Sequence, residues 1–278
     1  MTFAICNEIF DGWNLEEAMR FAARTGYEAI EIAPFTIAPY VTQVDATRRQ
    51  EIRDAAARVG ILISGIHWVL AKTQGLHLTH PDEAMRHRTG EYLAELVGFC
   101  ADVGGTRMIV GSPKQRNREL GVSHEQASEW ARAVFAPAVQ RAEDCDVVIC
   151  FEPLSPAETN FINTAAEARA LVATVASPAF QIILDVKAMS SEDRPIPAII
   201  HETAGQVAYF HANDRNLKGP GFGDVDFKPI AQALREIDYQ GVVSVEVFDF
   251  TEGPEVIATR SLAYLRQSFA DEDDQPVG

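Results

Sequence analysis

The sequence predicts an α/β protein that folds as one closed (β/α)8 barrel, a single domain over residues 1–270. Three observations favour this fold. Apolar runs of strand length alternate with stretches of helical periodicity along the chain. The alternation repeats eight times without a linker, which implies parallel strands joined by right-handed crossovers. The length of 278 residues is typical of a single barrel of this kind.

The first half of the chain contains four strand–helix units. We expect strands at 3–6, 29–33, 61–66 and 107–110, and helices at 15–25, 45–59, 81–103 and 123–144. Gly26, Gly60 and Gly104 follow the first three helices, where a glycine commonly ends a helix. Ser123, with Gln126 three residues later, predicts a capping box at the start of the fourth helix.

The second half of the chain repeats the same pattern. We expect strands at 147–151, 181–184, 207–210 and 242–245, and helices at 164–176, 195–203, 227–238 and 254–269. An open doubly wound sheet is the alternative, but its typical G-x-G-x-x-G does not follow the first strand. The acidic residues 271–278 are expected to form a frayed tail.

The composition indicates the class of partner. A net charge of -16 disfavours nucleic acid, because binding phosphates needs a basic face. The sequence has no apolar stretch long enough for a membrane span, and its N-terminus does not resemble a signal peptide. The four cysteines contain no C-x-x-C pair, so a disulfide framework is not expected. We therefore expect a cytoplasmic protein with a small-molecule partner, and a homo-oligomer is compatible with this.

Four side chains of metal-ligand type follow four successive strands of the second half: Glu152, Asp185, His211 and Glu246. In a parallel barrel, the C-terminal ends of the strands face the active site. A single carboxylate at a strand end can instead cap a helix or pair with an arginine. Three carboxylates buried together would repel one another strongly without a cation. The pattern therefore predicts a site for one divalent metal ion.

The order Glu, Asp, His, Glu at the ends of strands five to eight resembles the xylose-isomerase-like TIM barrel superfamily. The resemblance is carried by the segments CFEPLSPAETNFINT, ILDVKAMS, FHANDRNLKGPGFGDVDF and VSVEVF. That superfamily includes ketose 3-epimerases, hydroxypyruvate isomerases, two kinds of dehydratase and the apurinic-site endonucleases. The ketose epimerases imply that Glu152, Asp185, His211 and Glu246 hold one ion, Mn²⁺ first, with Mg²⁺, Co²⁺ or Zn²⁺ as alternatives. They also imply that Glu152 and Glu246 form the acid/base pair, and that Glu158 contacts the substrate.

Two positions depart from the ketose epimerase pattern. Ala188 stands where many epimerases carry a His, and Leu217 stands where they carry an Arg. Both of those side chains hold the substrate in the epimerases. Lys187, Arg215 and Lys218 are the neighbours that could replace them, and a surface role is the alternative for each. The missing His also weighs against a three-metal endonuclease site, as does the sequence Gly-Asp-Val-Asp at 223–226, where an Asp-x-His is needed.

Loop residues after the earlier strands complete the expected pocket. His67 and Trp68 close the third strand, where we expect them to form a polar and an apolar wall for the sugar. Lys114 and Arg116 follow the fourth strand and are expected to bind a substrate carboxylate or phosphate. The alternative for these two is a solvated basic loop. Three further candidates for pocket lining are Asn7, Glu8 and Glu31.

These residues favour one reaction type. A carboxylate removes a proton next to a carbonyl, and a divalent ion stabilises the enediolate that forms. Return of the proton on the opposite face gives epimerisation, return to the neighbouring carbon gives isomerisation, and loss of a β-hydroxyl gives dehydration. We therefore expect a metal-dependent sugar or sugar-phosphate isomerase or epimerase. The alternative is a metal-dependent dehydratase or lyase on a cyclic polyol or keto-sugar. An apurinic-site endonuclease-like nuclease and a non-catalytic sugar-binding barrel are less favoured.

Overall fold

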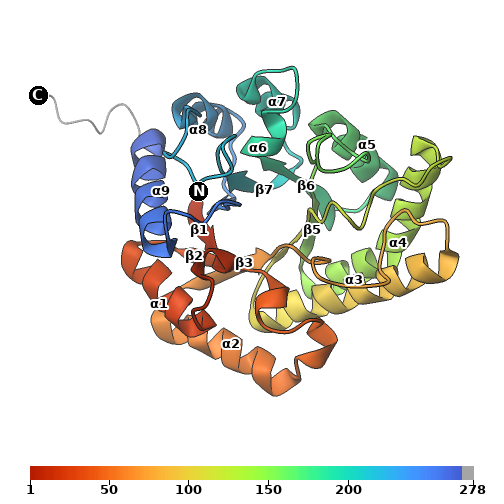
Figure 1. Ribbon diagram of the computed structural model, residues 1–278, viewed down its shortest axis with the longest axis horizontal. Coiled ribbons are helices and arrows are strands. Elements are labelled where there is room, and N and C mark those ends of the chain that lie inside the picture. Colours follow the sequence, from red (N-terminus) through yellow and green to blue (C-terminus); the bar gives the residue numbers. More distant parts are fainter. Residues whose placement is uncertain (271–278) are drawn as a thin grey trace, which may run out of the picture.

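The computed structural model describes residues 1–270, in which eight strands form a closed parallel barrel surrounded by helices (Figure 1). Each strand pairs with the next one in chain order, and β8 (Val242–Val245) closes the barrel against β1 (Thr2–Cys6). The predicted fold is confirmed, and the open doubly wound alternative is wrong. The frayed tail expected at 271–278 lies outside the described residues.

The strands lie where the apolar runs predict them, with differences at their ends. Between β1 and β8 come β2 (Ala29–Ile32), β3 (Leu62–Ile66), β4 (Arg107–Val110), β5 (Val148–Phe151), β6 (Phe180–Asp185) and β7 (Val207–Ala212). Both β6 and β7 extend past the apolar runs to include Asp185 and His211, which are partners in the ladder. Backbone pairing continues through these polar residues because it depends on main-chain groups rather than on hydropathy.

The helices also follow the predicted order. They are α1 (Leu15–Thr25), α2 (Ala46–Val59), α3 (Glu83–Val103), α4 (His124–Cys145), α5 (Ala165–Val175), α6 (Val186–Met189), α7 (Ile196–Glu202), α8 (Phe227–Glu236) and α9 (Pro254–Phe269). Three short 3₁₀ helices, η1 (Asn7–Phe10), η2 (Pro34–Thr36) and η3 (Val41–Gln43), follow β1 and β2. The short α6 and the 3₁₀ helices were not predicted, because so few residues show no hydrophobic period.

The predicted helix ends are mostly correct. Gly26, Gly60 and Gly104 each adopt the left-handed conformation after their helices. Ser123 caps α4 by accepting a hydrogen bond from the Gln126 N–H. The expected capping box is wrong in its second half, because the Gln126 side chain donates to Glu129 at 3.1 Å instead of reaching back.

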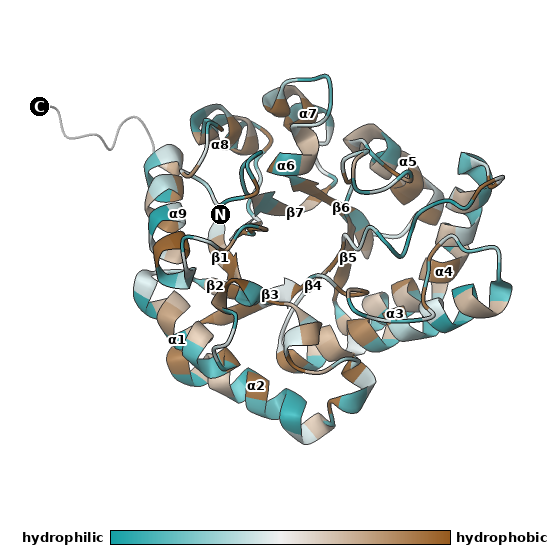
Figure 2. Ribbon diagram, in the orientation of Figure 1, coloured by the Kyte–Doolittle hydropathy of each residue, from teal (hydrophilic) through white to brown (hydrophobic). Residues whose placement is uncertain are grey.

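The apolar core occupies the layer between the strands and the surrounding helices. Figure 2 shows hydrophobic residues concentrated on the strands, whereas α2 carries many hydrophilic residues. A smaller buried cluster on β4 to β7 contains Ile109, Cys150, Ile183, Ala208 and Tyr209. The C-terminal ends of the strands are therefore held on a rigid, apolar framework.

Within residues 1–270, every helix is too short or too polar to cross a membrane.

Candidate active site

The structure brings together the four residues that follow or end β5 to β8. Glu152 comes directly after β5, Asp185 ends β6, His211 is the penultimate residue of β7, and Glu246 comes directly after β8. Each offers one ligand atom, and these atoms all lie within 4.8 Å of one another. All four side chains are buried. A single ion placed among them would touch three carboxylates and one imidazole.

His211 is oriented by a carboxylate on the opposite side of its ring. Its Nε2 atom lies 3.2 Å from both oxygens of Glu31, on β2, and donates to them. Its Nδ1 atom lies 3.2 Å from Glu246 Oε2 and 3.7 Å from Glu152 Oε1. A metal-binding histidine usually donates its other ring N–H to such a carboxylate, which fixes its tautomer and orientation. The arrangement therefore places Nδ1 toward Glu152 and Glu246.

Asp185 is held by hydrogen bonds to both carboxylate oxygens. Oδ1 accepts the Ala188 N–H at 2.6 Å, and Oδ2 accepts the side-chain amide of Asn213 at 2.5 Å. Asn213 is fixed in turn because its Oδ1 accepts the Lys187 N–H at 2.8 Å. Each carboxylate oxygen has a second lone pair left for an ion. The short α6 thus serves to orient Asp185.

The position of Glu152 requires a glycine on the neighbouring strand. Gly111 follows β4, and a Cβ atom added there would lie 1.6 Å from Glu152 Oε2. Such a distance is far inside van der Waals contact, so any larger residue at position 111 would displace the carboxylate. The sequence pattern did not single out this glycine, because the requirement comes from the packing of two adjacent strands.

The charges of this cluster are compatible with a bound cation. Burial, together with repulsion from Glu152 and Glu246, raises the pKa of Asp185 to about 7. Burial alone would lower the pKa of His211, but the Glu246 and Glu31 carboxylates raise it well above its usual range. Within the described part of the chain, the buried His211 Nδ1 and Glu246 Oε2 have no hydrogen-bond partner. A divalent ion would satisfy these atoms and neutralise the repulsion, so the residues fit one.

Behind the four residues lies a buried polar network that involves His67. Its Nε2 atom is 2.8 Å from Glu8 Oε2, and its Nδ1 atom is 3.5 Å from Glu31 Oε1. Glu31 also accepts the Tyr209 hydroxyl at 3.0 Å. Glu31 was expected only as a pocket-lining candidate, but it is fully buried and supports His211. Its sequence signal is an acidic residue inside the apolar run of β2.

Above the four residues, a pair of opposite charges and two aromatic rings close the site. Lys187 Nζ lies 2.7 Å from Glu158 Oε1 and 3.8 Å from the ring centre of Phe248. Burial alone would raise the pKa of Glu158, but the hydrogen bond and charge of Lys187 lower it. The rings of Trp68 and Phe248 meet edge to face at 6.1 Å. Phe248 was not predicted, because nothing in the sequence separates it from a core phenylalanine.

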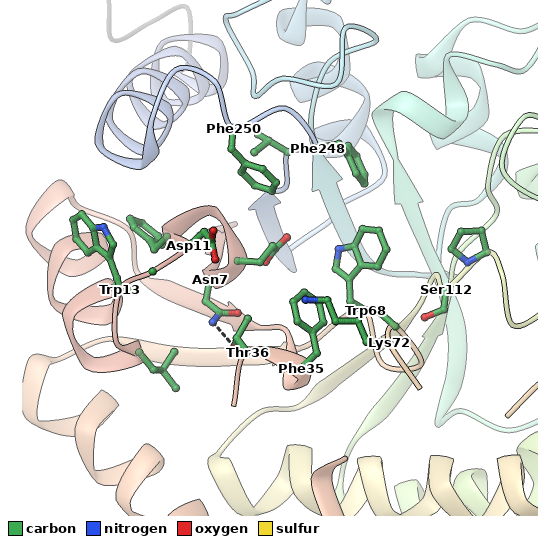
Figure 3. Close-up of a pocket in the computed structure, with 18 of the residues that line it drawn as sticks. Asn7, Asp11, Trp13, Phe35, Thr36, Trp68, Lys72, Ser112, Phe248 and Phe250 are labelled. Carbon is green, nitrogen blue, oxygen red and sulfur yellow. Dashed lines mark hydrogen bonds between the residues drawn. The ribbon is translucent and has the colours of Figure 1, made fainter. Parts of the chain in front are cut away.

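Two cavities open at the C-terminal ends of the strands. The small cavity, of about 20 Å³, is lined by His67, Trp68, Ile109, Gly111, Pro113, Glu152, Leu154, Glu158, Lys187, Glu246 and Phe248. The large cavity, of about 970 Å³, is lined by residues that follow β8 and β1 to β4, among them Asn7, Glu8 and Lys114. Figure 3 shows part of this lining, including Asn7 and Ser112. Trp68, Pro113 and Phe248 line both cavities, which are therefore adjacent.

Residues 19–268 match the family model described as the xylose isomerase-like TIM barrel. The chain belongs to the xylose isomerase-like TIM barrel family. The family resemblance predicted from the four strand-end segments is thereby confirmed.

The curated relatives of the chain include several sugar epimerases. A D-psicose 3-epimerase of Agrobacterium fabrum is 26% identical over 251 residues, which cover 87% of this chain and 84% of the relative. A 3-dehydro-D-guloside 4-epimerase of Escherichia coli is 25% identical over 271 residues, which cover 94% of this chain and 97% of the relative. A crystal structure of a D-psicose 3-epimerase shares the fold, with a TM-score of 0.85, 21% identity, and coverage of 98% of this chain and 100% of that one.

Three positions expected to bind substrate in this family member lie away from the small cavity. Lys114 lines only the large cavity, and Arg215 is exposed and lines neither. Arg116 is fully buried and also lines neither cavity. At the two departures from the epimerase pattern, Ala188 is buried and Leu217 is 44% exposed.

The geometry of Arg116 differs from both sequence expectations, a substrate anion contact and a solvated loop. Its Nη1 atom donates to the Glu152 carbonyl at 2.6 Å, and its guanidinium lies 5.0 Å from the ring centre of Phe151. Burial lowers the pKa of Arg116 to about 10, although Glu152 and Glu158 oppose this shift. The side chain therefore supports the backbone at the end of β5. Lys114 of the same loop is exposed, so of the two only Arg116 turns inward.

Proposed function

We propose that the protein is a metal-dependent sugar epimerase in which Glu152 and Glu246 are the acid/base pair. One observation carries the proposal. The two carboxylates come from different strands, both are buried, and both line the same small cavity. A carboxylate on each side of a reacting carbon can remove a proton from one face and return it to the other. That is the requirement for inverting a carbon next to a carbonyl.

The donor set supports a divalent metal ion in this role. Glu152, Asp185, His211 and Glu246 would hold it, and their oxygen-rich set suits Mn²⁺, with Mg²⁺, Co²⁺ and Zn²⁺ as alternatives. When bound, the ion supplies positive charge that stabilises the developing enediolate. Asp185 and His211 do not line the small cavity, so we assign them to holding the ion and not to proton transfer.

The paired side chains above the site would bind the substrate. Lys187 and Glu158 offer a donor and an acceptor at the edge of the small cavity, which suits neighbouring sugar hydroxyls. His67 and Trp68 line the same cavity on its other side. Epimerisation is favoured over dehydration because the named relatives are epimerases that act on ketoses or on a keto-glycoside. A small sugar or sugar derivative is the partner that this site fits.

The test is a screen of ketoses and keto-glycosides in D₂O with the Mn²⁺-loaded protein, read by mass spectrometry and NMR. We expect one deuterium in the product at an inverted carbon, and no product after the metal is removed. Asp185→Asn should abolish both product formation and deuterium uptake. A product that has lost water would show a dehydratase instead. Sugar binding by the metal-loaded protein without any deuterium uptake would show a binding protein, and the proposal would fail.

A further inference from the structure

The large cavity beside the four strand-end residues has no part in the proposed proton transfer. Its volume of about 970 Å³ lies at the top of the range of about 300–1,000 Å³ seen for pockets that enclose drug-sized ligands. The small cavity, at about 20 Å³, has room for roughly one water molecule. A reacting sugar must therefore extend into the large cavity, which is larger than one hexose needs.

The two cavities adjoin at a polar junction, where one acidic lining residue of each lies close to His67. Glu8 lines the large cavity and Glu246 lines the small one, and together with His67 they offer ligand atoms within 4.8 Å of one another. In the described part of the chain, Glu8 Oε1, His67 Nδ1 and Glu246 Oε2 are buried without a hydrogen-bond partner. Glu246 Oε2 faces His211 and the ion site, and His67 Nδ1 faces Glu31, but Glu8 Oε1 would be satisfied by a hydroxyl of a molecule bound in the large cavity. One ligand can therefore occupy the junction and the large cavity together.

Aromatic rings dominate the part of the large cavity beyond this junction. Figure 3 shows Phe248 and Phe250 on one side and Phe35 on the other, with Trp68 next to Phe248 and Trp13 at the far end. Phe250 is 42% exposed, so its ring is accessible to a molecule in the cavity. Flat aromatic faces pack well against aryl groups and against the apolar faces of sugar rings.

The charges of the large cavity give no net attraction for a phosphate. Its lining contains two acidic residues, Glu8 and Asp11, and two basic ones, Lys72 and Lys114, so its formal charges cancel. Lys72 Nζ also lies 4.1 Å from the ring centre of Phe35, which places this cation over an aromatic face. A phosphate site needs a convergent set of positive groups or backbone N–H donors. The lining thus favours a neutral ligand.

We propose that the large cavity is a subsite for the neutral aglycone of a keto-glycoside, whose sugar ring reacts between Glu152 and Glu246. The proposal rests on the proposed epimerase function and names its substrate class. The aglycone is a ring with an apolar face, which an aryl group or a second sugar residue provides. A free ketose would leave the aromatic part of the cavity filled only by water, and would gain none of this packing.

The test compares three substrates with the Mn²⁺-loaded protein: a phenyl 3-keto-glucoside, a 3-keto-disaccharide and free fructose. We expect kcat/KM for at least one glycoside to exceed that for fructose by about tenfold or more. Phe250→Ala and Phe35→Ala should each lower the glycoside-to-fructose ratio by about threefold to tenfold, mainly through KM, since ring packing is shared by ground and transition states. Leu120→Ala, at an exposed leucine outside both cavities, is the control and should leave the ratio unchanged.

The outcomes separate this proposal from the epimerase function. If fructose reacts as well as both glycosides and the variants do not change the ratio, the aglycone subsite is disproved while the epimerase function stands. If no sugar exchanges deuterium, the function fails, and calorimetric titration of the phenyl glycoside decides the subsite. Binding that weakens in Phe250→Ala supports it, and absent binding overturns it. If Phe250→Ala instead changes the oligomeric state, a second copy covers the cavity and the proposal is wrong.

Discussion

Glu31→Gln tests how much the buried carboxylate behind His211 contributes to the metal site. Both Glu31 oxygens lie 3.2 Å from His211 Nε2, and the side chain has no exposure to solvent. The substitution keeps the shape and one acceptor oxygen but removes the negative charge. The amide also presents donors toward the Tyr209 hydroxyl, which now donates to Glu31 at 3.0 Å. The perturbation is therefore mainly electrostatic.

The size of the effect follows from the competition between a proton and a divalent metal ion for His211 Nδ1. The Glu31 charge raises the pKa of His211 and also favours a metal ion on the same ring, but a divalent ion carries twice the charge of a proton. Losing the Glu31 charge should therefore weaken metal binding more than it weakens proton binding to His211. Replacing a partner of a metal-binding histidine typically costs about tenfold to 100-fold in affinity, or about 1.4–2.7 kcal/mol. We expect Mn²⁺ affinity at pH 7.5 to fall within this range.

Calorimetric titration with Mn²⁺ measures the affinity, and thermal melts of the metal-free proteins show that the variant is folded. Glu28→Gln is the matched control, because Glu28 is exposed near the start of β2 and its side chain accepts the Phe3 N–H at 3.0 Å. It should bind Mn²⁺ as the wild type does. If folded Glu31→Gln keeps the wild-type affinity, Glu31 does not support a metal-bound His211, and the assignment of His211 as a ligand loses its main support.

Three further predictions concern the same site. Glu152→Gln and Glu246→Gln should each lower kcat about 100-fold or more while keeping the metal, and near wild-type rates for both would place the acid/base role elsewhere. Gly111→Ala should lower kcat by about 100-fold because its Cβ would meet Glu152 Oε2 at 1.6 Å, whereas Gly98→Ala, with contacts no closer than 3.6 Å, should keep the rate. The metal-free protein should lose thermal stability from pH 5 to pH 8. The pKa of Asp185 is about 7 when folded and 3.8 by default, so its stabilising contribution is full below pH 4 and lost as the pH passes 7. Melts of Asp185→Asn should show a smaller loss, and an equal loss would contradict this assignment.

The order of the strands and the four strand-end residues could be predicted from the sequence. Each of the four follows an apolar run, and parallel strands bring such positions to one end of the barrel. The role of Glu31 could not be predicted, because it depends on which residue of β7 faces β2 across the interior of the barrel. The burial of Arg116 was equally hidden, since a basic residue in a polar loop gives no sign of an inward-facing carbonyl partner.

The four strand-end residues and most of the large-cavity lining come from different parts of the chain. The four strand-end residues come from β5 to β8, whereas the large cavity is formed by segments after β8 and after β1 to β4, such as Trp68 and Gln115. Ligand positions set by strands tolerate little change, but loop segments accept substitutions and insertions readily. Mutation of the early loops can therefore alter which molecule is recognised while the reacting groups stay in place. Such a barrel can acquire new substrates by exchanging short segments, without rebuilding its chemistry.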